Sequence, residues 1–313
     1  MENQIVSVDQ LTREDLQNLR ELAARIKQNP DYYKRTAPLW NKTIIDYFVE
    51  ASTRTRFSFE IAAKELGAVV ISVGSDEACS IAKGETLEDT MRIFNGFADA
   101  VIMRHPEDNS AERAAAVLTV PFINAGSGKS EHPTQALLDV FTMQELKGEL
   151  DGVSVGIMSD LKYGRTTHSL SKLLALYDGV HLYGLPIPGL EFPQEYIQYL
   201  ESKGGKYTEC NSIEDFPRDI DFIYQTRVQN ERIPKKRGIL KLRRDDFESK
   251  QTIIDQKLMT HFSKDTFVLH PLPRRGEIST NFDGDPRAKY FEQAYNGVHV
   301  RKAVLLTVLD KDI

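Results

Sequence analysis

The sequence predicts an α/β protein built from two doubly wound parallel-sheet domains. Short apolar runs typical of buried strands alternate with longer segments in which apolar residues recur every three or four positions, as in amphipathic helices. Such alternation favours parallel sheets with helices on both faces. The chain has 313 residues, more than one typical domain, and the pattern starts again after Gly148. We therefore expect two α/β domains of similar size.

The first half alternates strands and helices from its start. Thr12 is the expected N-cap of a helix that reaches Lys27, with Asp15 in the capping-box position. A helix after the first strand ends near Gly67, and others begin near Thr86 and at Pro133. The expected strands cover 44–49, 68–73, 100–103 and 121–123. The segments 74–84 and 126–131 show no periodicity and are expected to be loops.

The second half repeats this organisation. A loop is expected over 160–165, followed by a helix that contains Leu170, Leu173 and Tyr177. The expected strands cover 153–158, 180–185, 221–225 and 266–269, and further helices cover 193–203 and 290–309.

Composition excludes several classes of protein. The apolar and charged fractions, 41% and 27%, are those of a soluble globular protein. The net charge of -6 argues against a general nucleic-acid binder. No apolar run is long enough to cross a bilayer, and the N-terminus lacks the pattern of a signal peptide. Cys79 and Cys210 are far apart and lack metal-ligand spacing, so we expect a cytoplasmic protein without a metal site.

The stretch Ser-Thr-Arg-Thr-Arg at 52–56 lies between an expected strand and an expected helix. The first N–H groups of a helix have no intrahelical partner, and the positive end of the helix dipole lies there. Hydroxyls and guanidiniums at this point suit a phosphate group. The alternative is an ordinary helix cap with solvated arginines.

Basic side chains recur just after the expected strands, or in the loops that follow them. In open α/β sheets, ligands bind outside the carboxyl ends of the strands. This placement predicts a cleft between the two domains for a polyanionic substrate, although a structural ion pair could explain any single residue. The residues concerned are Arg54, Arg104, His132, Arg165, Arg227 and His270.

Other motifs are less specific. His132 is expected at a helix start, where a neutral imidazole can donate to a carbonyl oxygen, and Gln135 offers both a donor and an acceptor. Arg227 could grip a carboxylate through two hydrogen bonds. The segment 126–130 resembles a P-loop but lacks its first glycine, because Ile123 stands there. The basic run over 234–244 is typical of a solvated loop.

Five motifs in order resemble the aspartate carbamoyltransferase family, in its catalytic chain. They are Ser-Thr-Arg-Thr-Arg at 52–56, His-Pro-Thr-Gln at 132–135, Asp-Leu-Lys-Tyr-Gly-Arg-Thr at 160–166, Thr-Arg-Val-Gln at 226–229 and His-Pro-Leu-Pro-Arg at 270–274. The resemblance covers essentially the whole chain. It implies transfer of the carbamoyl group from carbamoyl phosphate to L-aspartate, an early step of de novo pyrimidine biosynthesis, without cofactor or metal. It also implies a carbamoyl phosphate domain over 1–133 plus about 288–313, and an aspartate domain over 134–287.

The resemblance further implies a role for each matching residue. The residues expected to hold the phosphate are Ser52, Thr53, Arg54 and Thr55. Thr55, Arg104 and His132 are expected to polarise the carbonyl oxygen. Gln135 and the backbone carbonyls of Pro271 and Leu272, with Pro273 beside them, are expected to bind the carbamoyl NH2 group. The expected aspartate ligands are Arg165, Thr166, Arg227 and Gln229.

The implied assembly is a homotrimer with shared active sites. Ser80 and Lys83 would enter the site of a neighbouring subunit, and Glu50, Arg165 and Arg232 would form the ion pairs of the closed domains. The resemblance leaves room for a regulatory chain in a larger assembly. The sequence differs from the family pattern in three places. It has a single lysine near 83, Ser127 in place of an aspartate, and an unusually basic segment over 234–262.

Two rival functions stay open from the sequence. An ornithine carbamoyltransferase shares the carbamoyl phosphate half but typically has a cysteine where this chain has Pro271. A non-catalytic homologue would be expected to lack one of the phosphate or carbonyl ligands, and none is missing here.

Overall fold

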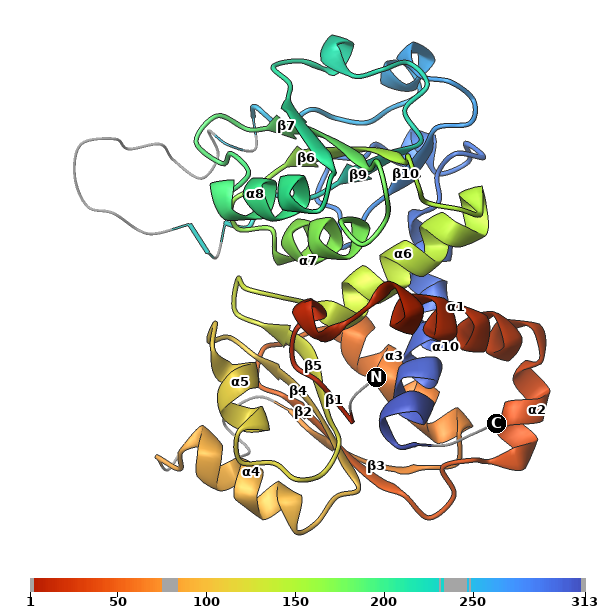
Figure 1. Cartoon of the computed structure of the whole chain (residues 1–313), viewed down its shortest axis with the longest axis vertical. Coiled ribbons are helices and arrows are strands. Elements are labelled where there is room, and N and C mark those ends of the chain that lie inside the picture. The colour runs from red at the N-terminus through yellow and green to blue at the C-terminus, as the bar shows by residue number, and fades with distance from the viewer. Residues whose placement is uncertain (1–2, 75–83, 231, 234–246, 248, 311–313) are drawn as a thin grey trace. The chain divides into compact units, whose positions relative to one another are not determined.

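The computed structural model describes residues 3–74, 84–230, 232–233, 247 and 249–310. By its internal contacts, the chain divides into two compact units (Figure 1). The first unit comprises Met1–Phe141 and Tyr295–Ile313, and the second comprises Thr142–Ala294. The borders fall inside two helices, α6 (Pro133–Lys147) and α10 (Tyr290–Val308).

The first unit contains a five-stranded, wholly parallel sheet in the order β1-β5-β4-β2-β3. Its strands are β1 (Gln4–Ile5), β2 (Thr43–Phe48), β3 (Val69–Val73), β4 (Ala100–His105) and β5 (Phe122–Ser127). Its helices, besides parts of α6 and α10, are α1 (Arg13–Gln28), α2 (Pro30–Thr36), α3 (Thr53–Glu65), α4 (Leu87–Asn95) and α5 (Ser110–Ala115).

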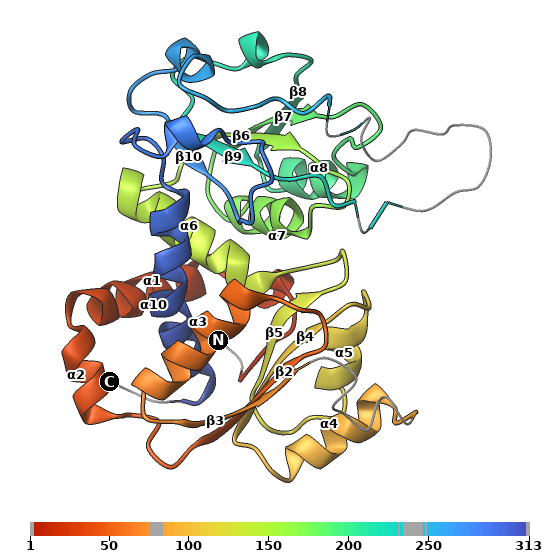
Figure 2. The same ribbon diagram turned by 180° about the vertical axis from the view of Figure 1, so that it is seen from behind.

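Helices cover both faces of this sheet. In Figures 1 and 2, α4 and α5 lie on one face, and α1, α3 and α10 lie on the other. The core on the first face joins side chains of α4 and α5, including Met91 and Ala111, to strand residues such as Tyr47 and Val101. The central strand β2 is buried along almost its whole length, as expected of a parallel strand covered on both sides.

Local sequence signals define several helix ends. Thr12 and Asp15 form the predicted capping box of α1, and the side chain of Thr86 accepts from the Asp89 backbone N–H at the start of α4. Gly67 follows α3 with a φ of +91°, and a Cβ there would lie 2.7 Å from the Cβ of Ala37. This position therefore requires glycine both for its conformation and for the close approach of the chain.

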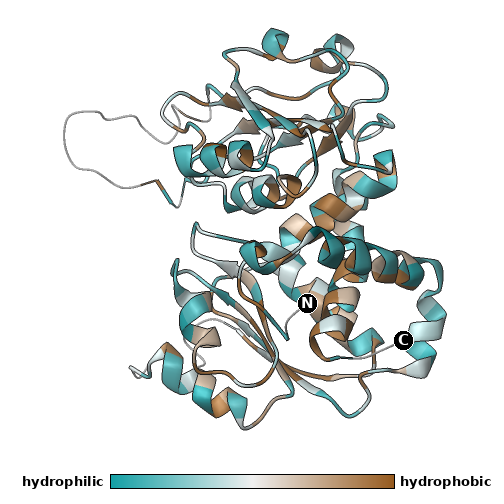
Figure 3. Ribbon diagram, viewed as in Figure 1, coloured by the Kyte–Doolittle hydropathy of each residue, from teal (hydrophilic) through white to brown (hydrophobic). Residues whose placement is uncertain are grey.

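The second unit contains another five-stranded parallel sheet, in the order β10-β9-β6-β7-β8. Its strands are β6 (Ser154–Ser159), β7 (His181–Pro186), β8 (Lys206–Glu209), β9 (Phe222–Gln225) and β10 (Phe267–Leu269). Its helices include α7 (Arg165–Leu174) and α8 (Gln194–Ser202), which lie along one face in both views. A buried cluster around Ile223, Val268 and Phe282 occupies the core. Figure 3 shows apolar residues on the buried strands and polar residues on outward helix surfaces.

Among the described residues, two strands and one α-helix escaped the sequence analysis. The two-residue strand β1 is too short to show a pattern, and α2 covers only seven residues. The edge strand β8 has the sequence Lys-Tyr-Thr-Glu and no residue buried. An edge strand with one solvated side needs no apolar alternation, so its sequence gives little sign of a strand.

Several expected boundaries were wrong. The helix expected to contain Tyr177 ends at Leu174. β5 continues through Gly126 and Ser127, which are buried, so the expected loop over 126–131 loses its first two residues. Arg104 lies inside β4 rather than after it, because pairing with β2 extends beyond Met103. Arg165 is the first residue of α7 and does not belong to the preceding loop. Among the described residues, no helix is long and apolar enough to cross a membrane.

Candidate active site

The strand order of each sheet indicates where a ligand would bind. In the first unit, the chain leaves β2 for β3 on one side and later returns to β4 on the other side. In the second unit, β7 and β8 extend one side of β6, and β9 and β10 extend the other. Ligands of open α/β sheets bind at such switch points, beyond the carboxyl ends of the two diverging strands. The candidate sites therefore lie beyond β2 and β4 and beyond β6 and β9.

The switch point of the first unit leads from β2 into the N-terminus of α3. Ser52 is the N-cap residue, with extended φ and ψ of -157° and 104°, but its side chain makes no capping hydrogen bond. Arg54 is exposed, and the first turn of α3 contains no acidic residue. Without a carboxylate in the first turn, the positive end of the helix dipole stays available to an anion. This geometry is what a phosphate site over 52–55 requires.

Three predicted carbonyl ligands converge beside this helix end. The Nε2 atom of His132 lies 3.4 Å from Oγ1 of Thr55 and 3.4 Å from an Nη atom of Arg104. The side chains come from α3, from β4 and from the residue before α6. Both contacts are long, and a neutral imidazole can carry its proton on Nε2 and donate it to a carbonyl oxygen. Thr55 and His132 are buried, which removes competing water from the cluster.

A carboxylate orients one member of this cluster. Nη2 of Arg104 donates to Oε1 of Glu50 over 2.5 Å, and the side chain of Arg104 is only 11% exposed. Glu50 was expected to take part in ion pairs of closed domains, and here it holds Arg104 within the first unit. Its role in domain closure stays a prediction.

Gln135 lies in the first turn of α6, and its side chain is anchored. Its Nε2 donates over 2.8 Å to Oδ1 of Asp139, one helical turn further on, and Asp139 is completely buried. Asp139 was missed from the sequence. The signal that could have revealed it is the spacing of four residues between two polar side chains on an otherwise apolar helix.

Two further ionisable residues are buried close to α3. Arg301 of α10 is almost fully buried, and its guanidinium lies 5.1 Å from the ring of Phe59. Burial, assisted by the charge of Arg54, lowers the pKa of Arg301 to about 10 against the opposite effects of Asp139 and Asp46.

Asp46 of β2 is itself fully buried, and neither of its carboxylate oxygens has a hydrogen-bond partner in the part of the chain that the structure describes. Burial, assisted by the charge of Glu60, raises the pKa of Asp46 to about 8 against the attraction of Arg56 and Arg301. Asp46 is thus a buried and mostly neutral acid, whereas an aspartate is usually exposed and ionised.

In the second unit, predicted aspartate ligands flank the switch point between β6 and β9. Arg165 begins α7 beyond β6 and is buried, and Thr166 beside it is partly exposed. Arg227 follows β9, and its Nη1 donates over 3.0 Å to the carbonyl of Val228. Two residues later, the backbone N–H of Gln229 donates over 2.9 Å to Asp160.

Asp160 is the residue that joins the two loops. It directly follows β6, is completely buried and also accepts from the backbone N–H of Tyr163 over 2.9 Å. Burial raises the pKa of Asp160, and its hydrogen bonds to backbone N–H groups oppose that rise. Gln251 adds a second link, because its Nε2 donates to Oγ of Ser159 and to the carbonyl of Thr226 over 2.6 and 2.8 Å.

His270 has a different position from the one expected. Its ring is fully buried, where Nδ1 accepts from the backbone N–H of Leu272 over 2.7 Å and Nε2 contacts Oε1 of Glu277 over 2.7 Å. Because Nδ1 accepts, Nε2 carries the proton and donates to the carboxylate. His270 therefore shapes the turn of Pro271, Leu272 and Pro273 and is not a cation presented to a substrate. Leu272 adopts a φ of +55° in this turn.

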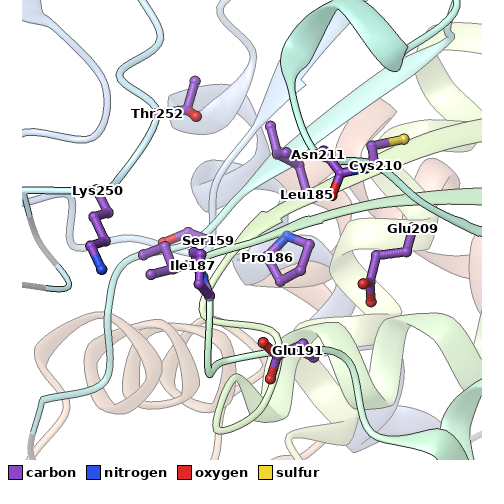
Figure 4. Close-up of a pocket in the computed structure, with 11 residues that line it drawn as sticks. Ser159, Leu185, Pro186, Ile187, Glu191, Glu209, Cys210, Asn211, Lys250 and Thr252 are labelled. Carbon is purple, nitrogen blue, oxygen red and sulfur yellow. The ribbon is translucent and has the colours of Figure 1, made fainter.

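Two cavities open on the second unit. A cavity of about 180 Å³ is lined by Arg227, Gln251 and Arg275, among others, so one predicted aspartate ligand borders it. A larger cavity of about 280 Å³ lies at the carboxyl ends of β6, β7 and β8 (Figure 4). Its lining includes Ser159, Glu191 and Lys250, but none of the predicted site residues. The predicted residues Ser80 and Lys83 lie outside the described part of the chain.

The chain matches two family models in succession. Residues 3–145 match the aspartate/ornithine carbamoyltransferase carbamoyl-P binding domain, and residues 151–308 match the Asp/Orn binding domain of the same family. The chain is 41% identical over 305 residues to the aspartate carbamoyltransferase catalytic subunit of Haloquadratum walsbyi, and the match covers 97% of each chain.

Solved structures agree with these matches. The catalytic subunit of M. jannaschii aspartate transcarbamoylase superposes with a TM-score of 0.88 at 36% identity, over 99% of each chain. The aspartate transcarbamoylase of Trypanosoma cruzi, in complex with carbamoyl phosphate and aspartate, gives 0.85 at 34% identity, over 96% of this chain and 95% of the other. With its parallel sheets, its switch-point residues and these matches over nearly its whole length, the chain belongs to the aspartate/ornithine carbamoyltransferase family.

Proposed function

We propose that this chain is an aspartate carbamoyltransferase, which transfers the carbamoyl group of carbamoyl phosphate to L-aspartate. The products are N-carbamoyl-L-aspartate and phosphate. Relatives named for this activity match nearly the whole chain, and one was solved with carbamoyl phosphate and aspartate. The observation that carries the proposal is the convergence of Thr55, Arg104 and His132 beside the N-terminus of α3.

The reaction needs positioning and charge stabilisation rather than a protein nucleophile. The amine of aspartate attacks the carbonyl carbon, a C–N bond forms, and the bond from that carbon to the phosphate oxygen breaks. The departing phosphate accepts the amine proton. Negative charge grows on the carbonyl oxygen during attack, and Thr55, Arg104 and His132 would stabilise it as an oxyanion hole. Glu50 supports this role because it fixes the guanidinium of Arg104.

The phosphate and the amino group of the substrate have separate partners. Ser52, Thr53 and Arg54 at the helix N-terminus would hold the phosphate and stabilise it as it leaves. Gln135 would bind the carbamoyl NH2 group together with the backbone carbonyls of Pro271 and Leu272, and Pro273 completes that turn. The bonds from His270 to Leu272 and Glu277 support this role, since they define the backbone of the turn.

The second substrate would bind through residues of the second unit. Arg165, Thr166, Arg227 and Gln229 would hold the carboxylates of aspartate. Ornithine carries a single carboxylate and a cationic side chain, so a pair of arginines favours the dicarboxylate. Asp160 and Gln251 support the arrangement, because they tie the loop after β9 to the end of β6.

The proposal extends to the assembly. A homotrimer would let Ser80 and Lys83 complete the site of a neighbouring subunit. The relative from Haloquadratum walsbyi is named a catalytic subunit, and this supports a regulatory chain as a further partner. The protein would act in the cytoplasm, where its two widely spaced cysteines would stay reduced as thiols.

The test compares aspartate and ornithine as acceptors of the carbamoyl group in parallel assays of the wild type and of Arg227→Ala. We expect turnover with aspartate only. In the variant, the aspartate requirement should rise steeply and turnover should fall, because a lost charge-assisted pair is worth about 1.5–3 kcal/mol. Binding of carbamoyl phosphate alone, measured by calorimetry, should stay near that of the wild type.

Each other outcome has a definite meaning. Turnover with ornithine would replace this proposal with the ornithine-type reaction. Equal weakening of carbamoyl phosphate and aspartate binding in Arg227→Ala would contradict the division of the substrates between the two units.

A further inference from the structure

The carbamoyl group presents a donor, its NH2 group, and Gln135 must meet it with an acceptor. A glutamine side chain has a carbonyl oxygen and an NH2 group of nearly the same shape, so either could face the substrate. If the NH2 group of Gln135 faced the carbamoyl NH2 group, two donors would oppose each other. Binding therefore depends on which way the amide of Gln135 is turned.

Asp139 settles that choice in the structure. Its Oδ1 lies 2.8 Å from Nε2 of Gln135, and an ionised carboxylate can only accept. The amide nitrogen must then face Asp139, which leaves Oε1 of Gln135 as the atom for another partner. Both side chains project from the same helix one turn apart, and Asp139 is fully buried, so water cannot substitute for it.

Arg301 supplies the positive charge that suits an ionised Asp139. The charges of Arg301 and Asp139 attract each other, and Arg301 is almost fully buried on α10. Gly297 makes room for this guanidinium, because a Cβ there would lie 2.3 Å from Nη1 of Arg301. An opposite charge nearby favours the ionised form of a carboxyl group, and that form can only accept.

We propose that Asp139 is a positioning residue, which turns the amide of Gln135 so that its Oε1 accepts from the carbamoyl NH2 group of the substrate. The proposal rests on the proposed function, since it assumes that Gln135 meets the carbamoyl group. It assigns no contact between Asp139 and the substrate. Asp139 acts only through Gln135, and Arg301 supports it from α10.

The test is Asp139→Asn, which keeps the shape of the side chain and removes its charge. Arg301 has only donors, so the new amide oxygen should face Arg301 and the new NH2 group should face Gln135. The amide of Gln135 would then turn over and oppose the substrate with a donor. Two ligands separate this effect from general damage: phosphonoacetamide, which has the amide NH2 group, and inorganic phosphate, which lacks it.

Calorimetric titration should show phosphonoacetamide binding weakened about tenfold or more, as for a buried donor left without an acceptor. Phosphate binding should be unchanged. Equal weakening of both ligands would overturn the proposal, because a merely structural role predicts that result. Unchanged binding of both would overturn it as well. A wild type that binds phosphate but not phosphonoacetamide would refute the proposed function instead.

Two further variants complete the design. In a Gln135→Ala background, Asp139→Asn should cause no additional loss of phosphonoacetamide binding, because the two residues act through one interaction. The pair Gln135→Glu with Asp139→Asn keeps one carboxylate in the hydrogen-bonded pair and presents an acceptor on both sides. It should fold even if Asp139→Asn alone does not, and it should bind phosphonoacetamide better than Gln135→Ala does. Failure of a folded double variant to do so would contradict the proposal.

Discussion

The buried acid Asp46 offers a direct test of the electrostatics around α3 and the phosphate site proposed at its N-terminus. It lies in the central strand β2 with no exposed surface, near Glu60 and Arg56 of α3 and Arg301 of α10. The change to make is Asp46→Asn, which resembles the protonated acid in shape but cannot ionise. We expect it to alter how the stability of the chain depends on pH.

The magnitude follows from the pKa. In the folded chain the pKa of Asp46 is raised from 3.8 to about 8, so the folded state keeps a proton that the unfolded state releases. The stability contributed by the protonated acid is fully present below pH 3.8 and is lost as the pH rises toward 8. Each pH unit costs about 1.4 kcal/mol, so the total loss between pH 3.8 and 8 is about 6 kcal/mol.

Urea unfolding of the wild type and of Asp46→Asn at several pH values between 5 and 8 measures this loss. The free energy of unfolding of the variant should gain about 3–4 kcal/mol relative to the wild type across that range. Asp265→Asn is a suitable control, because Asp265 is exposed and meets water in both states. Its profile should parallel that of the wild type. A parallel profile for Asp46→Asn would mean that Asp46 is already ionised in the folded chain, and the reasoning from burial would be wrong.

Two predictions concern catalysis and assembly. Arg54→Ala should lower turnover by about 10²–10³-fold or more while the chain stays folded, because a charge-stabilising group at the leaving phosphate is lost. Steady-state kinetics measure the turnover, and circular dichroism checks the fold. Near-normal turnover would remove Arg54 from the mechanism. Mixing inactive Lys83→Ala chains with inactive Arg54→Ala chains should restore activity in some sites of hybrid trimers, and hybrids shown to form without any recovery would contradict a shared site.

The sequence alone determined the family and the fold class, and both are confirmed. Local signals were sufficient for this. Strand and helix periodicity depends on neighbouring residues, and so do the N-caps at Thr12 and Thr86. The hypothesis of a phosphate site over 52–56 also came from local signals, because a strand, three hydroxyl residues and a helix start lie within a few residues of each other. The polar strand β8 was not predicted, because an edge strand need not contain the apolar residues by which strands are identified.

Only the tertiary structure decided which polar residues are buried and which partners they meet. The apolar run over 44–49 predicts a buried strand, but the sequence near Asp46 and Asp139 does not show that both interact with Arg301 of α10, more than a hundred residues away. Thr55 and His132 are 77 positions apart in the sequence. They meet because Thr55 follows β2, His132 follows β5, and these two strands end at the same edge of one parallel sheet. His270 was expected to present a cation to the substrate, but it pairs with Glu277 and stabilises the turn that follows it. Contacts between residues far apart in the sequence follow from tertiary packing. The periodicity of apolar residues along the chain predicts helices and strands but not these contacts.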